Sequence, residues 1–184
     1  MLRHLPNLLS GLRLCAAPFA AWAILSNHDS AALLVFVFAG ASDGLDGFIA
    51  RRWGFTSRFG AWLDPAADKL LMLLCFAALY EIGAAPPWLV VLVFARDLAI
   101  AAAWLATKAF ALPIRFEALM IGKATTAVQI GYAGLSLLLL AFDREMPRLM
   151  LAAAYATAVF TVASGIAYGH LLLRAVFPGR HQVS

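Results

Sequence analysis

Charged side chains and cysteines are both scarce in this chain of 184 residues. Charged residues make up 13% and hydrophobic residues 64%, which excludes a soluble globule and is typical of a membrane protein. Cys15 and Cys75 both fall within apolar segments, so neither a disulfide framework nor a zinc site is indicated. No glycine-rich nucleotide loop ends in Lys and Ser or Thr, and no Ser or Cys nucleophile has a neighbouring His. Any chemistry must come from other residues.

Most of the chain lies in apolar segments long enough to cross about 30 Å of hydrocarbon as helices. They are residues 7–26, 31–52, 59–80, 86–107, 118–141 and 147–175. The breaks between them are short: 27–30, 53–57, 84–87, the stretch around Pro113, and 143–147. Short connections favour antiparallel neighbours in a compact bundle. The sequence therefore predicts an all-α integral membrane protein, with six transmembrane helices in a single domain over residues 1–184.

The basic residues are distributed unevenly along this pattern, which indicates an orientation. Six crossings place on one side Arg3, Arg51, Arg52, Arg58, Lys108, Arg115, Arg174 and Arg180, and on the other chiefly Arg144 and Arg148. We therefore expect both termini and the break at 53–57 to be cytoplasmic. The formal net charge of +4 suits contact with anionic lipid headgroups and does not indicate nucleic-acid binding.

Four aspartates stand close together in this apolar chain. Asp43 and Asp46 are spaced i, i+3, and Asp64 and Asp68 are spaced i, i+4, so each pair points from one face of its helix. The two faces can meet across the short break between the helices. Four uncompensated carboxylates in or beside a membrane would repel one another, so cations are their natural partners. Because the ligands are oxygens, the sequence predicts a site for Mg²⁺ or Mn²⁺, open to the cytoplasm.

Small and basic residues are interleaved with these aspartates. Gly44, Gly47 and Gly60 remove side chains beside the acids, so a nucleotide-sized group can approach the backbone. Glycine alone would indicate helix packing, but among four aspartates it favours a ligand site. Arg51 is in fixed register with the acids and suits phosphate oxygens, whereas Arg52 is typical of a cytoplasmic helix end. Two metals beside bound phosphates indicate phosphoryl transfer, in which a further carboxylate can deprotonate the nucleophile.

The same stretch resembles the signature of the CDP-alcohol phosphatidyltransferases. It matches at all eight fixed positions, which are Asp43, Asp46, Gly47, Ala50, Arg51, Gly60, Asp64 and Asp68. Aspartate is rare in membrane helices, so a chance match at eight positions is improbable. Two other segments are similar to that family: Pro6, Asn7, Ser10, Arg13 and Pro18 to its opening segment, and Gly122, Lys123, Thr126 and Gln129 to its fifth helix.

The resemblance implies a six-helix homodimer that transfers a phosphatidyl group from CDP-diacylglycerol to a glycerol-bearing alcohol and releases CMP. It assigns Asp43, Asp46, Asp64 and Asp68 to two Mg²⁺ or Mn²⁺ ions, with Asp68 also the proposed catalytic base. It assigns Gly47, Ala50, Arg51 and Gly60 to the CDP site. We expect the protein to lie in the bilayer of a bacterial inner membrane, with this active site facing the cytoplasm.

The acceptor alcohol is indicated by residues beyond the eight signature positions. The signature region is similar to both phosphatidylglycerophosphate synthases and CMP-forming cardiolipin synthases, and Arg96 followed by Asp97 resembles the cardiolipin branch. Thr125 stands where many glycerophosphate enzymes have the second lysine of Gly-Lys-x-Lys-Thr, which weakens a site for a small dianionic phosphate. We expect phosphatidylglycerol as acceptor, giving cardiolipin, with glycerol 3-phosphate as the alternative.

Basic residues that could bind the acceptor or its phosphate are Arg96, Arg115 and Lys123. Arg96 and Asp97 lie near the middle of the fourth segment, where ionisable groups face a cavity or one another. Adjacent helical residues point about 100° apart, so we expect each to have a partner on another helix rather than to pair directly. A structural ion pair is an equal alternative for Arg96. Lys123 is favoured as a phosphate-site residue because Thr126 and Gln129 are expected to share its face.

Two other classes of protein fit the four aspartates less well. A divalent-metal channel or transporter could use them as a permeation site, but the acids cluster near one membrane face and the other helices offer no continuous polar path. An inactive helical scaffold would not explain why all eight signature positions are present.

Overall fold

The computed structural model describes residues 5–53, 60–109 and 119–176, and their side chains over 11–42, 66–109 and 119–173. Within these residues the helices are α1 (Leu5–Leu25), α2 (Asp29–Trp53), α3 (Gly60–Glu81), α4 (Pro87–Ala109), α5 (Met120–Ala141) and α6 (Pro147–Val176). Each predicted apolar segment corresponds to one helix, and the breaks at 27–30, 84–87 and 143–147 are confirmed. The break around Pro113 and most of the break at 53–57 lie outside the described residues.

Helices α1, α3 and α5 all end in the same way. Each is followed by a residue in the left-handed conformation: Asn27 (φ 57°), Gly83 (φ 76°) or Asp143 (φ 48°). The next backbone amide donates to a carbonyl five residues earlier; the His28 N–H, for example, lies 2.8 Å from the Ala23 oxygen. Gly, Asn and Asp adopt this conformation at the lowest cost. These three residue types therefore end the helices and begin short turns.

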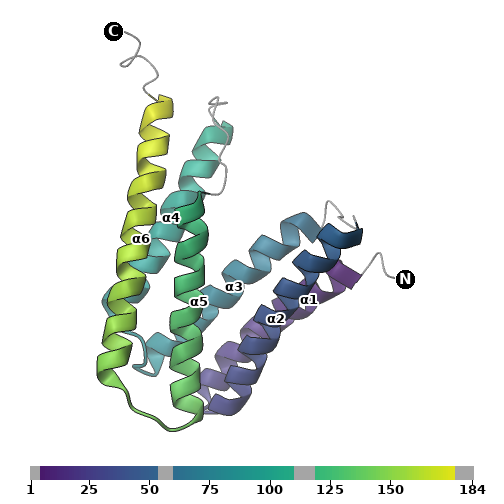
Figure 1. Cartoon of the computed structure of the whole chain (residues 1–184), viewed down its shortest axis with the longest axis vertical. Helices are drawn as coiled ribbons and strands as arrows, with labels where there is room; N and C mark the ends of the chain where they lie inside the picture. Colours follow the sequence, from purple (N-terminus) through teal and green to yellow (C-terminus); the bar gives the residue numbers. More distant parts are fainter. Residues whose placement is uncertain (1–4, 54–59, 110–118, 177–184) are drawn as a thin grey trace. The chain divides into compact units, whose positions relative to one another are not determined.

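The chain divides into two compact units, of which the first contains α1, α2, α3 and the part of α5 from Ala133. In this unit α1 packs against both α2 and α3, as Figure 1 shows. Many of its buried residues are alanines: Ala17, Ala20, Ala23, Ala32, Ala39, Ala67 and Ala78. Small residues let helix backbones approach closely, which is a common basis of helix association in membranes.

The second unit contains α4, α5 up to Tyr132, and α6. Here side-chain hydrogen bonds join α5 to α6. The Thr125 hydroxyl lies 2.9 Å from the Phe160 carbonyl oxygen, and the Gln129 amide donates to the Thr161 hydroxyl at 3.3 Å. Such bonds between buried polar groups strengthen helix pairs where no water competes for them.

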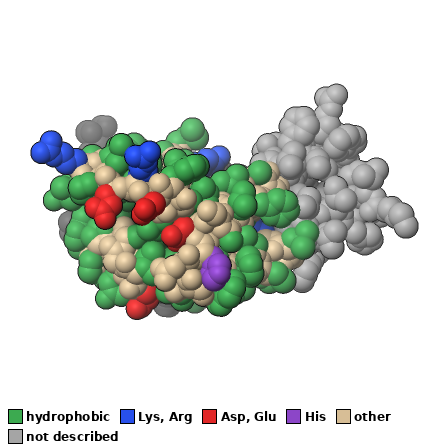
Figure 2. All heavy atoms as spheres, turned by 90° about the horizontal axis from the view of Figure 1, so that it is seen from below, with side chains coloured by type: hydrophobic (Ala, Val, Ile, Leu, Met, Phe, Trp, Pro, Cys, Tyr) green, Lys and Arg blue, Asp and Glu red, His purple; other side chains and the backbone are tan. Residues whose placement is uncertain are grey.

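Three of the described helical segments are long and apolar enough to cross a membrane: α4, α5 and Pro147–Leu173 of α6. Shorter apolar stretches belong to α1 (Gly11–Leu25) and α2 (Asp29–Ser42). Large apolar side chains are exposed on these helices; Leu34 is 70% exposed and Leu98 is 72% exposed. Figure 2 shows hydrophobic side chains over much of one face, on which several charged side chains and a histidine also lie. The chain is a membrane protein, and the count of six crossings stays a prediction.

Candidate active site

The eight signature residues lie on two consecutive helices of the first unit. Helix α2 carries Asp43, Asp46, Gly47, Ala50 and Arg51, and α3 carries Gly60, Asp64 and Asp68. Both stretches are helical as predicted, so the spacings i, i+3 and i, i+4 place each aspartate pair on one side of its helix. The side chains from 43 to 65 lie outside those that the structure describes. Their convergence on metal ions therefore stays a prediction.

The side chain of Asp68 is described, and it forms an ion pair with Arg13 of α1. Arg13 Nη1 donates to Asp68 Oδ1 across 2.9 Å. The Arg13 side chain is 1% exposed, whereas that of Asp68 is 46% exposed. A buried guanidinium is costly unless a partner accepts its hydrogen bonds, so this contact fixes both side chains. Arg13 thus holds one oxygen of Asp68 while the carboxylate remains partly accessible.

Sequence reasoning gave Arg13 no function beyond its likeness to the family's opening segment. A signal was present, because an arginine inside an apolar helix requires a polar partner within the protein. The partner lies 55 positions away along the chain, on a different helix. Periodicity within one helix does not indicate such a contact, so the pairing could not be predicted from α1 alone.

The predicted metal ligands are all carboxylates, a donor set that fits Mg²⁺ or Mn²⁺. Asp68 is the member of this set that can be compared with the structure. Its partly exposed carboxylate is oriented by a hydrogen bond from Arg13, as is usual for metal ligands that need a fixed direction. Among the described side chains, no group of three or more His, Cys, Asp or Glu is suited to a metal.

Arg96 and Asp97 of α4 pair directly, with Arg96 Nη1 2.7 Å from Asp97 Oδ1, and the prediction against a direct pair was wrong. The angle of about 100° separates the Cα–Cβ bonds of adjacent residues. The long arginine side chain can still bring its guanidinium back to the neighbouring carboxylate. The structural ion pair considered for Arg96 is therefore present, and acceptor binding by Arg96 stays a prediction.

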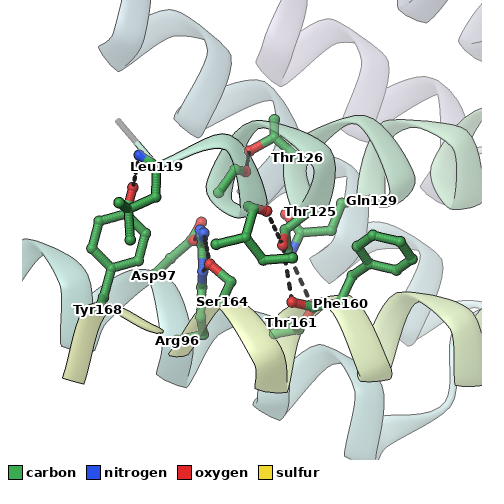
Figure 3. A network of polar contacts seen from close by, with 12 residues as sticks. Arg96, Asp97, Leu119, Thr125, Thr126, Gln129, Phe160, Thr161, Ser164 and Tyr168 are labelled. Atoms are coloured by element: carbon green, nitrogen blue, oxygen red, sulfur yellow. Dashed lines mark hydrogen bonds and ion pairs between the residues drawn. The ribbon is translucent and has the colours of Figure 1, made fainter. Parts of the chain in front are cut away.

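The expectation that Arg96 has a partner on another helix is confirmed. Its Nε and Nη2 atoms donate to the Ser164 hydroxyl of α6 at 3.2 Å and 2.5 Å, as Figure 3 shows. The guanidinium also lies 5.8 Å from the centroid of the Tyr168 ring, within the range of a cation–π contact. Arg96 therefore joins α4 to α6 inside the second unit.

Lys123 and Gln129 do not share a face of α5, contrary to the prediction. The Lys123 side chain is exposed, whereas Gln129 is buried and bonded to Thr161. Six residues turn a helix by about 600°, which leaves the two side chains about 120° apart. Thr126 is half-buried, and its hydroxyl donates to the Gly122 carbonyl at 3.2 Å. Lys123 keeps the exposure that a phosphate-binding residue needs, but Gln129 gives it no support.

Thr125 points into the packing between α5 and α6. Its side chain is fully buried, and its hydroxyl lies 2.7 Å from the Ile121 oxygen and 2.9 Å from the Phe160 oxygen. This hydroxyl is therefore used within the protein and is not presented to a substrate. The remaining predicted acceptor residue, Arg115, lies outside the described residues.

Residues 3–164 match the sequence model of the CDP-alcohol phosphatidyltransferases. This chain belongs to the CDP-alcohol phosphatidyltransferase family. The match extends from before α1 into α6, so the relationship covers both units rather than the signature alone.

Individual relatives carry two kinds of name. The chain is 31% identical to CDP-diacylglycerol–glycerol-3-phosphate 3-phosphatidyltransferase 1, chloroplastic, of Oryza sativa subsp. japonica, with 96% of this chain and 59% of that protein aligned. It is 33% identical to cardiolipin synthase (CMP-forming) of Rattus norvegicus, with 90% of this chain and 60% of that protein aligned. It is 34% identical to CDP-diacylglycerol–glycerol-3-phosphate 3-phosphatidyltransferase of Pectobacterium atrosepticum, over 90% of this chain and 92% of that protein. The chain thus spans about three fifths of the length of the first two.

Proposed function

We propose that this protein transfers the phosphatidyl group of CDP-diacylglycerol to a glycerol-bearing alcohol and releases CMP, as a step in phospholipid synthesis. The observation that carries the proposal is the complete eight-residue signature on α2 and α3, in a chain of the CDP-alcohol phosphatidyltransferase family. Family membership favours a transferase over a divalent-metal transporter.

The signature residues divide between two tasks in this proposal. Mg²⁺ or Mn²⁺ ions held by Asp43, Asp46, Asp64 and Asp68 would neutralise charge on the phosphate groups. Gly47, Ala50 and Gly60 leave space for CDP beside the helix backbones, because none has a side chain larger than a methyl group. Arg51 donates charge-assisted hydrogen bonds to phosphate oxygens.

Asp68 is the proposed base. The acceptor hydroxyl oxygen forms a bond to the phosphorus that carries the diacylglycerol, while the bond from this phosphorus to the oxygen of CMP breaks. The hydroxyl proton passes to the Asp68 carboxylate. The contact between Arg13 and Asp68 Oδ1 supports this role, because a base must be held in a defined direction and remain accessible.

We propose phosphatidylglycerol as the acceptor. A small soluble dianion needs a dense cationic pocket, and position 125 supplies neither a charge nor an available hydroxyl. A lipid acceptor has its own apolar anchor and can enter between helices from the bilayer. Glycerol 3-phosphate is the second candidate, since the Pectobacterium atrosepticum relative, which this chain covers almost throughout, is named for it.

We further propose that the protein lies in a bacterial inner membrane as a homodimer, with the signature on the cytoplasmic side. The asymmetry of basic residues supports the orientation. The family resemblance supports the dimer, which native mass spectrometry in detergent would contradict by detecting the monomer alone.

Release of CMP should require Mg²⁺ or Mn²⁺, and Asp64→Asn should abolish it by removing a charged ligand while the helices remain inserted. The measurement is CMP formed from CDP-diacylglycerol by the purified protein with either acceptor. Asp143→Asn is the matched control, because asparagine also adopts the left-handed conformation of that turn. Full turnover in excess chelator, or in Asp64→Asn, would refute the metal-dependent site.

Asp68→Asn should lower kcat by a factor on the order of 10² or more, the usual range for a lost general base, while CDP-diacylglycerol still binds. Arg13→Lys keeps the charge but loses the guanidinium geometry, and it should lower kcat about tenfold. Because both act through one carboxylate, the double variant should be no slower than Asp68→Asn. Arg148→Lys, at an exposed position, is the control. If the fall in kcat of the double variant equals the product of the two separate falls, Arg13 acts independently of Asp68.

Orientation can be read by labelling with a membrane-impermeant thiol reagent after Cys15 and Cys75 are replaced. A cysteine introduced at Ser57 should react only from the cytoplasmic side, and one at Ser30 only from the opposite side. The reason is that the basic residues concentrate on the side predicted to hold Ser57. Reversed labelling would show that the orientation or the number of crossings is wrong.

Cardiolipin should be the main product when phosphatidylglycerol and glycerol 3-phosphate are offered at equal concentration with labelled CDP-diacylglycerol. The physical reason is the missing second cation at position 125. The lipid products are separated and counted. If phosphatidylglycerophosphate is the main product, the acceptor is glycerol 3-phosphate and the proposal of phosphatidylglycerol is wrong. The proposed metal site and reaction class would not be affected.

A further inference from the structure

The start of α5 is held by a residue from another helix. The Leu119 carbonyl accepts hydrogen bonds from the Gly122 amide at 2.9 Å and the Lys123 amide at 3.2 Å, so Leu119 is the N-cap residue of α5. Leucine has no side-chain oxygen with which to cap the helix. The first N–H groups of a helix have no partners within it, so they need acceptors from elsewhere.

Tyr168 of α6 supplies one of these acceptors. Its hydroxyl oxygen accepts a hydrogen bond from the Leu119 N–H at 3.2 Å, as Figure 3 shows. In a capping box, the side chain three residues after the N-cap accepts this same N–H. Here that residue is Gly122, which has no side chain. A Cβ atom at Gly122 would lie 2.8 Å from the Tyr168 hydroxyl, so the tyrosine occupies the space that a capping side chain would fill.

The Tyr168 ring is in turn held by α4. Arg96 lies over the ring, and Asp97 and Ser164 bind its guanidinium. Ser164 precedes Tyr168 by four residues and so lies on the same face of α6. The three helices of the second unit therefore meet in one polar cluster at the beginning of α5, made of Arg96, Asp97, Leu119, Ser164 and Tyr168.

We infer that Tyr168 is a positioning residue for the acceptor, because it fixes the first turn of α5 and with it the backbone of Lys123. The inference rests on the proposed function and on the prediction from the sequence that Lys123 binds the acceptor phosphate; Lys123 has the exposure that this role needs. Both candidate acceptors carry a phosphate group, so the effect does not depend on which of them is used. Tyr168 itself need not touch substrate.

Tyr168→Phe removes the hydroxyl and keeps the ring beneath Arg96. It should raise the KM for the acceptor about three- to tenfold, the range expected for one lost hydrogen bond, and leave the KM for CDP-diacylglycerol unchanged. Both phosphatidylglycerol and glycerol 3-phosphate serve as probes, with CMP release as the readout. Tyr155→Phe is the matched control: it is the same change on the same helix, at an exposed tyrosine that stacks on Trp88.

Gly122→Ala tests the same contact from the other side. Its new methyl group would displace the Tyr168 hydroxyl, so this variant should also raise the acceptor KM. In Tyr168→Phe the nearest ring atoms would lie at 3.2 Å and 3.4 Å, which requires a smaller shift. The two changes together should therefore raise the KM by less than the product of their separate effects.

An acceptor KM that rises equally in Tyr168→Phe and Tyr155→Phe, or that is unchanged in both, overturns the inference. So does an equal rise in the KM of both substrates, which indicates a general loss of structure. If one of these results is found while the unaltered protein still releases CMP, the inference about Tyr168 fails and the proposed function is not affected. If the unaltered protein releases no CMP with either alcohol, the proposed function fails and this inference fails with it.

Discussion

A charged or strongly polar group inside an apolar protein must find a partner, because water is not available to solvate it. This constraint determines which helices of the chain are tied together. Arg13, almost fully buried on α1, meets Asp68 of α3, and Arg96 of α4 meets Asp97 and Ser164. Each arginine thus creates a specific contact within its own unit. Apolar packing alone would not distinguish one rotation of a lipid-facing helix from another.

Because buried polar groups must be paired, they serve to join helices, whereas exposed ionisable groups are accessible to a substrate. Thr125 and Gln129 are buried and use their polar groups to join α5 to α6, whereas Lys123 on the same helix is exposed. In the first unit, Arg13 is enclosed while its partner Asp68 is half exposed. In the first unit, a buried arginine contacts an accessible carboxylate. In the second unit, buried polar residues of α5 lie near the exposed Lys123 along the chain. That arrangement suits a catalyst whose reactive groups must be fixed and yet reachable.

Much of the fold could be predicted because its causes are local. Apolar segments of sufficient length gave the six helices, and Asn27, Gly83 and Asp143 end three of them by conformations open to those residue types. The sequence also predicted that the signature residues lie on two consecutive helices. The partner of Arg13, by contrast, depends on the packing of α1 against α3. The prediction for Arg96 failed because the angle between adjacent helical residues does not fix where the end of a long side chain lies. The prediction for Gln129 failed because six residues along a helix separate it from Lys123 by about 120°.

The proposed acceptor follows from residue type, and the packing of Thr125 bears on it as well. Position 125 cannot present a cation to a substrate, because it faces the carbonyl of Phe160 in the contact between α5 and α6. A lysine there would have to desolvate its ammonium group against α6 or move that helix away. Replacing Thr125 by lysine would therefore disturb the helix pair before it added charge to an acceptor pocket. The proposal of phosphatidylglycerol as acceptor thus depends on the packing of α5 on α6 as well as on the residue at position 125.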